Sequence, residues 1–139
     1  MYFATRNGVL EFDGRSWNLI PANGSVYSLQ VGSDGTLYWA GTNGFGTVTT
    51  DDQGFHHVQS LSPPEVKEVF VSLIVKDNLY FLSSEGLYFY NDAMKEPVMI
   101  PSSNLTGAFT GLFEIYGSLY LTSEQEALLK VEGNNLVRT

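Results

Sequence analysis

Short stretches of alternating apolar and polar residues, separated by turn-forming residues, run along almost the whole chain. The clearest stretch is 26–31, which is followed by Ser33-Asp34-Gly35, a second stretch at 37–40, and Asn43-Gly44. Alternation with a period of two predicts β-strands, and Gly with Asn or Asp between two such stretches predicts a hairpin. The same pattern continues through 69–90 and 108–121, without a convincing helical period. We therefore expect an all-β protein made of hairpins in series.

The predicted hairpins repeat along the sequence. A tyrosine within a strand recurs at intervals of 36, 42 and 40 residues, at Tyr2, Tyr38, Tyr80 and Tyr120. Six residues after each of them come Gly8, Gly44, Gly86 and Glu126. A strand, a tight turn and a second strand thus recur in register, and a period near 40 residues is typical of repeat architectures.

Each repeat is predicted to hold four strands, A to D in chain order. In the second repeat these are 26–31, 37–40, 45–49 and 55–58. The first repeat opens directly on strand B at 2–4, continues with 9–12 and 17–20, and has no strand A. About fifteen strands are therefore expected, in units covering residues 1–21, 25–61, 66–101 and 106–139.

Four-stranded antiparallel units of this length are what a β-propeller blade requires. The predicted fold is a partial β-propeller of about 3.75 blades, forming one domain over residues 1–139. An open row of blades leaves two apolar faces and one strand edge uncovered. Either four short blades close on themselves, or copies associate as a homo-oligomer, or the chain is a piece of a longer propeller whose remaining blades cover it.

Composition and charge narrow the range of partners. Hydrophobic residues make up 43% of the chain and aromatic residues 14%, as expected of a packed sheet protein. The net charge of -8 without a cluster of basic residues argues against nucleic acid, because a phosphate backbone would be repelled. The absence of cysteine excludes disulfides, thiolate catalysis and Cys-zinc sites. No stretch is long and apolar enough for a membrane helix, and the start lacks the features of a signal peptide, so no membrane contact by this segment is expected.

The repeat resembles that of the two-component regulator propellers, the sensor β-propellers of bacterial hybrid two-component systems. Their pattern is a glycine, a hydrophobic-aromatic pair, a small residue, Gly-Thr and a further glycine, and it is matched well by the segment Gly35-Thr36-Leu37-Tyr38-Trp39-Ala40-Gly41-Thr42-Asn43-Gly44. The first unit fits through residues 4–9, 12–14 and Trp17, and the third through 79–90. The fourth unit departs from the pattern, because it has Ser123-Glu124-Gln125-Glu126 in place of Gly-Thr and glycine.

This resemblance implies a non-catalytic sensor segment in the periplasm or another extracytoplasmic compartment. In that family, seven-bladed propellers precede a membrane helix and a histidine kinase or DNA-binding output, and they are thought to recognise nutrients such as glycan fragments. This chain would be about half of one propeller. Any kinase output would lie elsewhere in the parent protein.

The search for catalytic and metal-binding groups predicts no catalytic residue, no metal site and no cofactor. His56 and His57 are neighbours on a predicted strand, so their side chains point to opposite faces and cannot chelate one metal together. Asp34 and Asp51 fall in predicted turns, where aspartate caps backbone amides. A carbohydrate-active propeller enzyme stays open as an alternative, in which two of Glu85, Glu124 and Glu126 would converge.

The predicted ligand site lies in the turns between strands B and C, which emerge on one face of a four-stranded meander. Its candidate residues are Arg6, Asn7, Asn43, Glu85, Glu124 and Gln125. These hydrogen-bonding groups suit an oligosaccharide or another small polar, uncharged ligand, although Asn and Gly are also ordinary turn residues. A protein-interaction scaffold is a further alternative, favoured by an exposed apolar patch. The repeated aromatic residues Tyr38, Trp39, Tyr80 and Phe81 are predicted to belong to the core.

Overall fold

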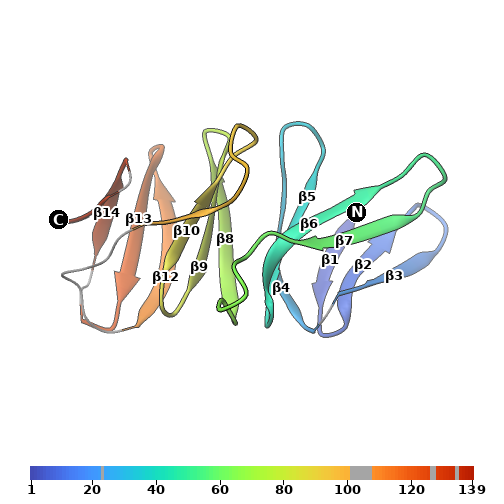
Figure 1. Cartoon of the computed structure of the whole chain (residues 1–139), viewed down its shortest axis with the longest axis horizontal. Coiled ribbons are helices and arrows are strands. Elements are labelled where there is room, and N and C mark those ends of the chain that lie inside the picture. Colours follow the sequence, from blue (N-terminus) through green and yellow to red (C-terminus); the bar gives the residue numbers. More distant parts are fainter. Residues whose placement is uncertain (23, 101–107, 126–127, 134) are drawn as a thin grey trace. The chain divides into compact units, whose positions relative to one another are not determined.

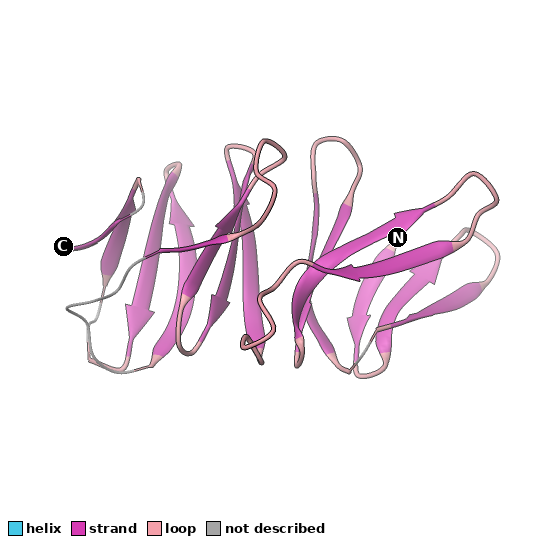
Figure 2. Ribbon diagram, in the orientation of Figure 1, coloured by secondary structure: helices cyan, strands magenta, loops and turns pink. Residues whose placement is uncertain are grey.

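Every element in the described part of the chain is a β-strand or a connection between strands (Figures 1 and 2). The computed structural model describes residues 1–22, 24–100, 108–125, 128–133 and 135–139. Its strands form two compact units, Met1–Phe70 and Val71–Thr139, and the boundary falls within strand β8. The all-β class and the antiparallel sheets expected from the sequence are confirmed. No helix within the described residues is long and apolar enough to cross a membrane.

The first unit contains two meander sheets, in which neighbouring strands follow one another in the chain. The first sheet consists of β1 (Tyr2–Thr5), β2 (Gly8–Phe12) and β3 (Trp17–Pro21). The second sheet consists of β4 (Val26–Val31), β5 (Leu37–Gly41), β6 (Gly44–Thr50) and β7 (His56–Ser60). Among the described residues the first sheet has no strand before β1, as the sequence predicts.

The second unit repeats this arrangement with two four-stranded meanders. The third sheet consists of β8 (Val69–Val75), β9 (Asn78–Ser83), β10 (Leu87–Tyr90) and β11 (Val98–Ile100). The fourth sheet consists of β12 (Phe109–Ile115), β13 (Ser118–Ser123), β14 (Leu129–Glu132) and β15 (Asn135–Arg138). Strand β12 lies beside β9 within this unit, and the amide of Phe109 donates a 3.0 Å hydrogen bond to the carbonyl of Ser84.

The core of the first unit lies between its two sheets. Val9 and Ile20 of the first sheet meet a face of the second sheet, and the cluster contains Val26, Leu37, Trp39 and Val48. In β5, β9 and β13 the residues on either side of the repeated tyrosine supply the apolar contacts, because alternate residues of a strand share a face. Thus Leu37 and Trp39 in β5, Leu79 and Phe81 in β9, and Leu119 and Leu121 in β13 are all buried.

The repeated tyrosine itself is buried only in the second sheet. Tyr38 is 3% exposed, whereas Tyr80 is half-buried and packs its ring 5.5 Å from that of Phe89. The prediction that Tyr80 belongs to the core is therefore wrong in degree, while Tyr38, Trp39 and Phe81 are buried as predicted. Both tyrosines point to the side opposite their buried neighbours, and this side is covered at Tyr38 but only partly covered at Tyr80.

Two of the repeated glycines begin strand C for a steric reason. Gly8 and Gly44 have φ angles of 137° and 110°, in the region that side chains rarely adopt. A Cβ atom at Gly8 would collide with the backbone of Ile20, and one at Gly44 with the side chain of Ser62. Glycine at this position therefore lets another segment pass close to the turn, which is the end of β3 at Gly8 and the chain after β7 at Gly44. Glu126, the exception in the fourth repeat, lies outside the described residues.

Candidate ligand-binding site

The residues predicted to bind a ligand all lie in equivalent turns. Arg6 and Asn7 connect β1 to β2, Asn43 lies between β5 and β6, and Glu85 lies between β9 and β10. Glu124 and Gln125 directly follow β13, and all six side chains are exposed. Three of these residues belong to the first unit and three to the second. Their convergence on one ligand stays a prediction.

Hydroxyl side chains that the sequence reasoning missed hold three of these turns in shape. In each turn the amide two residues later donates to the hydroxyl oxygen, over 3.2 Å from Asn7 to Thr5, 3.3 Å from Glu85 to Ser83 and 3.3 Å from Gln125 to Ser123. The sequence carried a signal for this, since a hydroxyl residue stands three positions after Tyr2, Tyr80 and Tyr120. The second repeat has Gly41 at this position, paired with Gly44 across the turn, and so has no side-chain hydroxyl there.

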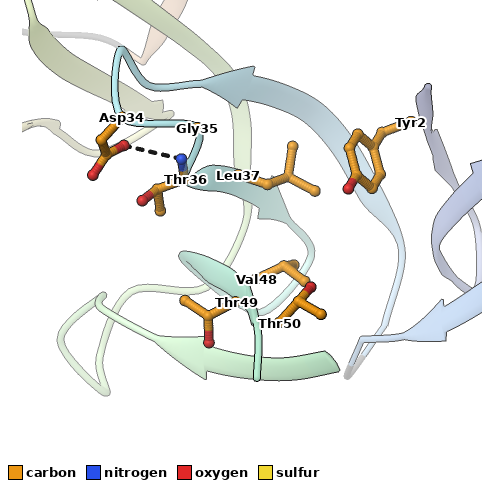
Figure 3. A pocket seen from close by; sticks show the side chains of 8 residues that line it. All are labelled: Tyr2, Asp34, Gly35, Thr36, Leu37, Val48, Thr49 and Thr50. Carbon is orange, nitrogen blue, oxygen red and sulfur yellow. Dashed lines mark hydrogen bonds between the residues drawn. The ribbon is translucent and has the colours of Figure 1, made fainter. Parts of the chain in front are cut away.

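A cavity of about 330 Å³ in the first unit offers a second candidate site, at the other end of the strands (Figure 3). It is bounded by β1, by the turn between β4 and β5 with the start of β5, and by the end of β6. Its lining residues are Tyr2, Asp34, Gly35, Thr36, Leu37, Val48, Thr49 and Thr50. In a meander the A–B and C–D turns lie opposite the B–C turns, so none of the predicted residues lines this cavity.

The polar groups of the cavity are largely hydroxyls. Three threonines and Tyr2 supply them, while Leu37 and Val48 supply apolar surface. Asp34 is the one carboxylate in the lining, and its Oδ1 accepts a 2.9 Å hydrogen bond from the amide of Thr36. This hydrogen bond confirms the predicted role of Asp34 as a turn residue, and together with the Thr36 hydroxyl it lowers the pKa of Asp34.

A set of polar contacts continues from the cavity between the two sheets of the unit. The Thr50 hydroxyl lies 2.8 Å from Nδ1 of His56, whose Nε2 lies 3.3 Å from a carboxylate oxygen of Glu11. Partial burial raises the pKa of Tyr2, and its hydrogen bond to Glu11 raises that pKa further. Tyr2 and Thr50 are thereby tied to fixed neighbours, so two walls of the cavity are held in place.

The two histidines have separate partners, as the strand alternation predicts. His56 contacts Glu11 and Thr50, whereas Nε2 of His57 donates to Asp51 over 2.9 Å. Among the described residues no group of three or more His, Asp or Glu side chains is placed to hold a metal ion. The cavity itself brings together one carboxylate, an aromatic ring and several hydroxyls, a combination suited to hydrogen bonding with a polar ligand and stacking on its flat face.

Comparison with known proteins gives one kind of likeness. No known protein family matches the sequence, and no curated protein matches it. The fold is similar to part of the extracellular domain of the putative one-component system BT4673 from B. thetaiotaomicron, with a TM-score of 0.72 and 15% sequence identity. The match covers 98% of this chain and 19% of that one, so the chain spans about a fifth of the length of its structural relative. At this identity the likeness is one of fold.

Proposed function

We propose that this chain is a non-catalytic ligand-binding segment of a bacterial sensor protein, built from β-propeller blades and placed outside the cytoplasm. The observation that carries the proposal is the fold shared with the extracellular domain of a putative one-component system over 98% of the chain. In the proposed sensor the ligand site lies outside the cytoplasm, in keeping with the extracellular position of the structural relative. An output module in another part of a longer protein would receive the signal.

The propeller assignment rests on the repeat and on the sheets. The three four-stranded meanders and the three-stranded first sheet recur about every 40 residues, which is the construction of propeller blades. The matching sequence pattern in the second repeat supports membership of the two-component regulator propeller family. The hydroxyl-held turns add a structural feature that recurs in the other three repeats.

The proposed ligand is a neutral oligosaccharide or a small molecule with similar hydrogen-bonding groups. Two places in the chain suit it, the B–C turns with Arg6 and Asn7, and the cavity beside Thr49 in the first unit. Both offer hydrogen-bonding side chains, and the cavity adds the ring of Tyr2 and the apolar side chains of Leu37 and Val48. Of the residues named for the alternative enzyme, Glu85 and Glu124 are exposed turn residues, and Glu126 lies outside the described part. We favour binding without hydrolysis.

The test is calorimetric titration of the chain with a panel of neutral oligosaccharides from plant and host glycans. Binding without release of shorter sugars would support a non-catalytic sensor segment, and release of reducing ends would establish the enzyme alternative. A chain that binds none of the panel and cleaves none would contradict the proposed ligand class. Fractionation of bacterial cells that produce the parent protein tests the proposed compartment separately, by showing in which fraction the protein is found.

Two variants then distinguish the candidate places. The double change Arg6→Ala and Asn7→Ala removes polar groups from the first B–C turn, and Thr49→Val removes a hydroxyl from the cavity with little change in shape. Whichever change weakens binding about tenfold, the equivalent of about 1.4 kcal/mol, marks the site. Gln53→Ala is a matched control, because Gln53 is exposed in the turn between β6 and β7 and does not line the cavity.

A further inference from the structure

The two faces of the first sheet differ sharply in exposure. The register places Ala4, Val9 and Ile20 side by side on one face, and Phe3, Leu10 and Leu19 on the other. Val9 and Ile20 are 0% and 3% exposed, whereas Phe3 and Leu19 are 43% and 49% exposed. The first face is covered by the second sheet. The second face is as apolar as a core and is left open to solvent.

Aromatic rings dominate this open surface, which we call the Phe3 face and define as Phe3, Leu10, Phe12, Trp17 and Leu19. The ring of Trp17 lies 4.7 Å from that of Phe12 and 5.7 Å from that of Phe3, and the Trp17 side chain is 55% exposed. None of the strand residues on this face carries an ionisable side chain. Contiguous apolar surface of this kind marks an interaction site.

The fourth sheet in the second unit has a similar imbalance. Leu112, Leu121 and Leu129 lie side by side on its covered face and are at most 5% exposed. The opposite side, which we call the Phe113 face, has a row across all four strands formed by Phe113, Tyr120, Lys130 and Val137. Phe113 and Val137 are 49% and 38% exposed, and Ile115, two residues from Phe113 along β12, is 45% exposed.

These two open faces are of opposite kinds within the repeat. On the Phe3 face lies Phe3, the residue that directly follows the repeated tyrosine of β1. The buried face of β5 carries the equivalent residue, Trp39. On the Phe113 face lies the repeated tyrosine itself, Tyr120. The covered face of the first sheet carries the equivalent tyrosine, Tyr2. In the first unit a face of the Trp39 kind packs on a face of the Tyr2 kind. Joining the Phe3 face to a Phe113 face would therefore repeat an interface that the chain already uses.

We propose that the Phe3 face of one chain binds the Phe113 face of a second copy, head to tail. Charge is compatible with this despite the net charge of -8, because the Phe3 face is uncharged and Lys130 on the other face is paired with Glu132 at 3.5 Å. The contact is heterologous, because two different faces meet, so assemblies of this chain grow until rotation closes a ring.

The experiment is light scattering on a sizing column with the full chain at several concentrations. We expect a mass of at least two chains of 15.4 kDa each, increasing with concentration. Trp17→Asp and Phe113→Asp each place a charge on one face, and each variant alone should elute as a single chain. A mixture of the two variants should regain a mass of two chains and no more, because it retains one intact face of each kind.

Three results would overturn the inference. They are a wild-type chain that stays monomeric at every concentration, a Phe113→Asp variant that still associates, and a mixture that does not recover. The second and third results are those expected if two Phe3 faces met each other, and a monomer would be expected if further sheets of a longer protein covered them. Phe55→Ser is a matched control, since Phe55 is 63% exposed in a turn on neither face. Leu19→Asp and Val137→Asp replace either variant if its thermal melt is lost.

Discussion

Nε2 of His56 on β7 lies 3.3 Å from Oε1 of Glu11 on β2, and this contact joins the two sheets of the first unit. The side chains are only 24% and 17% exposed. Glu11 also accepts a hydrogen bond from Tyr2, and His56 is bonded to Thr50 through its other nitrogen. A partly buried polar group with several partners is costly to leave unpaired. The four side chains therefore act as a polar link beside the apolar core.

We predict that Glu11→Gln lowers the free energy of unfolding by about 1–2 kcal/mol, because His56 loses a charged acceptor at a partly buried site. The same change should lower the pKa of Tyr2 toward its ordinary value of 10.0, since Glu11 contributes to raising it. Urea unfolding measures the first effect and ring-resolved NMR titration the second. Glu132→Gln is the matched control, because the Lys130–Glu132 pair is exposed and should be worth under about 0.5 kcal/mol. Equal costs for the two variants would contradict the link.

Asp51 should make the stability of the chain sensitive to acid. The hydrogen bond from His57 is the main cause that lowers the pKa of Asp51 below its ordinary value of 3.8, and the amides of Phe55 and Gln53 lower it further. A carboxyl with a lowered pKa in the folded state stabilises fully above its unfolded pKa. That stabilisation is lost as the pH falls through the lower folded value.

Urea unfolding measured at a series of pH values checks this expectation. The free energy of unfolding of the wild-type chain should fall as the pH drops below about 3.8, and Asp51→Asn should show a shallower fall, because an amide keeps an oxygen acceptor but does not titrate. Asp52→Asn, one residue along the same turn, is the matched control. An unchanged acid dependence in Asp51→Asn would refute the assignment.

The strands could be predicted closely because their two signals, alternation and repetition, are local or periodic. The turn after β8 shows the limit of these two signals. Asp77 and Asn78 are the typical turn residues after β8, but Lys76 and Asp77 form the turn, with φ angles of 52° and 67°, and Asn78 already begins β9. This two-residue turn has left-handed residues at both of its positions. Which two of three candidates supply them is decided by the pairing of the strands.

The sequence repeat predicts the positions of the strands better than it predicts which side chains are buried. The residue after the repeated tyrosine is buried as Trp39, Phe81 and Leu121, but its counterpart Phe3 is 43% exposed. Sequence periodicity fixes the direction in which a side chain points from the sheet. Whether another sheet lies there depends on what stands next to that sheet, which no local pattern records.

The two candidate ligand sites also differ in how far the sequence could predict them. The B–C turns could be predicted because each is a single short segment. The cavity combines Tyr2, the turn at Asp34 and the end of β6 at Thr50, which are distant in the sequence and come together only through the packing of two sheets. A hint was present in the run from Thr47 to Thr50, where hydroxyl residues crowd one strand. Such a run has no fixed meaning without the neighbouring sheet.

The neighbouring aromatic residues Phe81 and Tyr80 should respond very differently to truncation. Phe81→Ala is expected to cost about 3–5 kcal/mol, because the side chain is 0% exposed and its removal leaves a cavity. Tyr80→Ala should cost about 1–2 kcal/mol, since the half-buried ring loses mainly its contact with Phe89. Urea unfolding of both variants gives the comparison. A loss in the free energy of unfolding for Tyr80→Ala as large as that for Phe81→Ala would show that Tyr80 belongs to the core after all.

Gly8 and Gly14 separate backbone strain from collision with a neighbouring segment. Both have positive φ angles, 137° and 102°, but a Cβ atom at Gly14 meets nothing within 4 Å, while one at Gly8 meets the backbone of Ile20 and Ala22. Gly14→Ala should therefore cost about 1–2 kcal/mol through conformation alone. Gly8→Ala should cost at least about 2 kcal/mol more, because the end of β3 has to move away from β2 and disturbs Ile20 in the core. Thermal and urea unfolding measure both. Equal losses would mean that the close passage of the chain at Gly8 does not constrain the first sheet, and that the repeated glycine is required only for its φ angle.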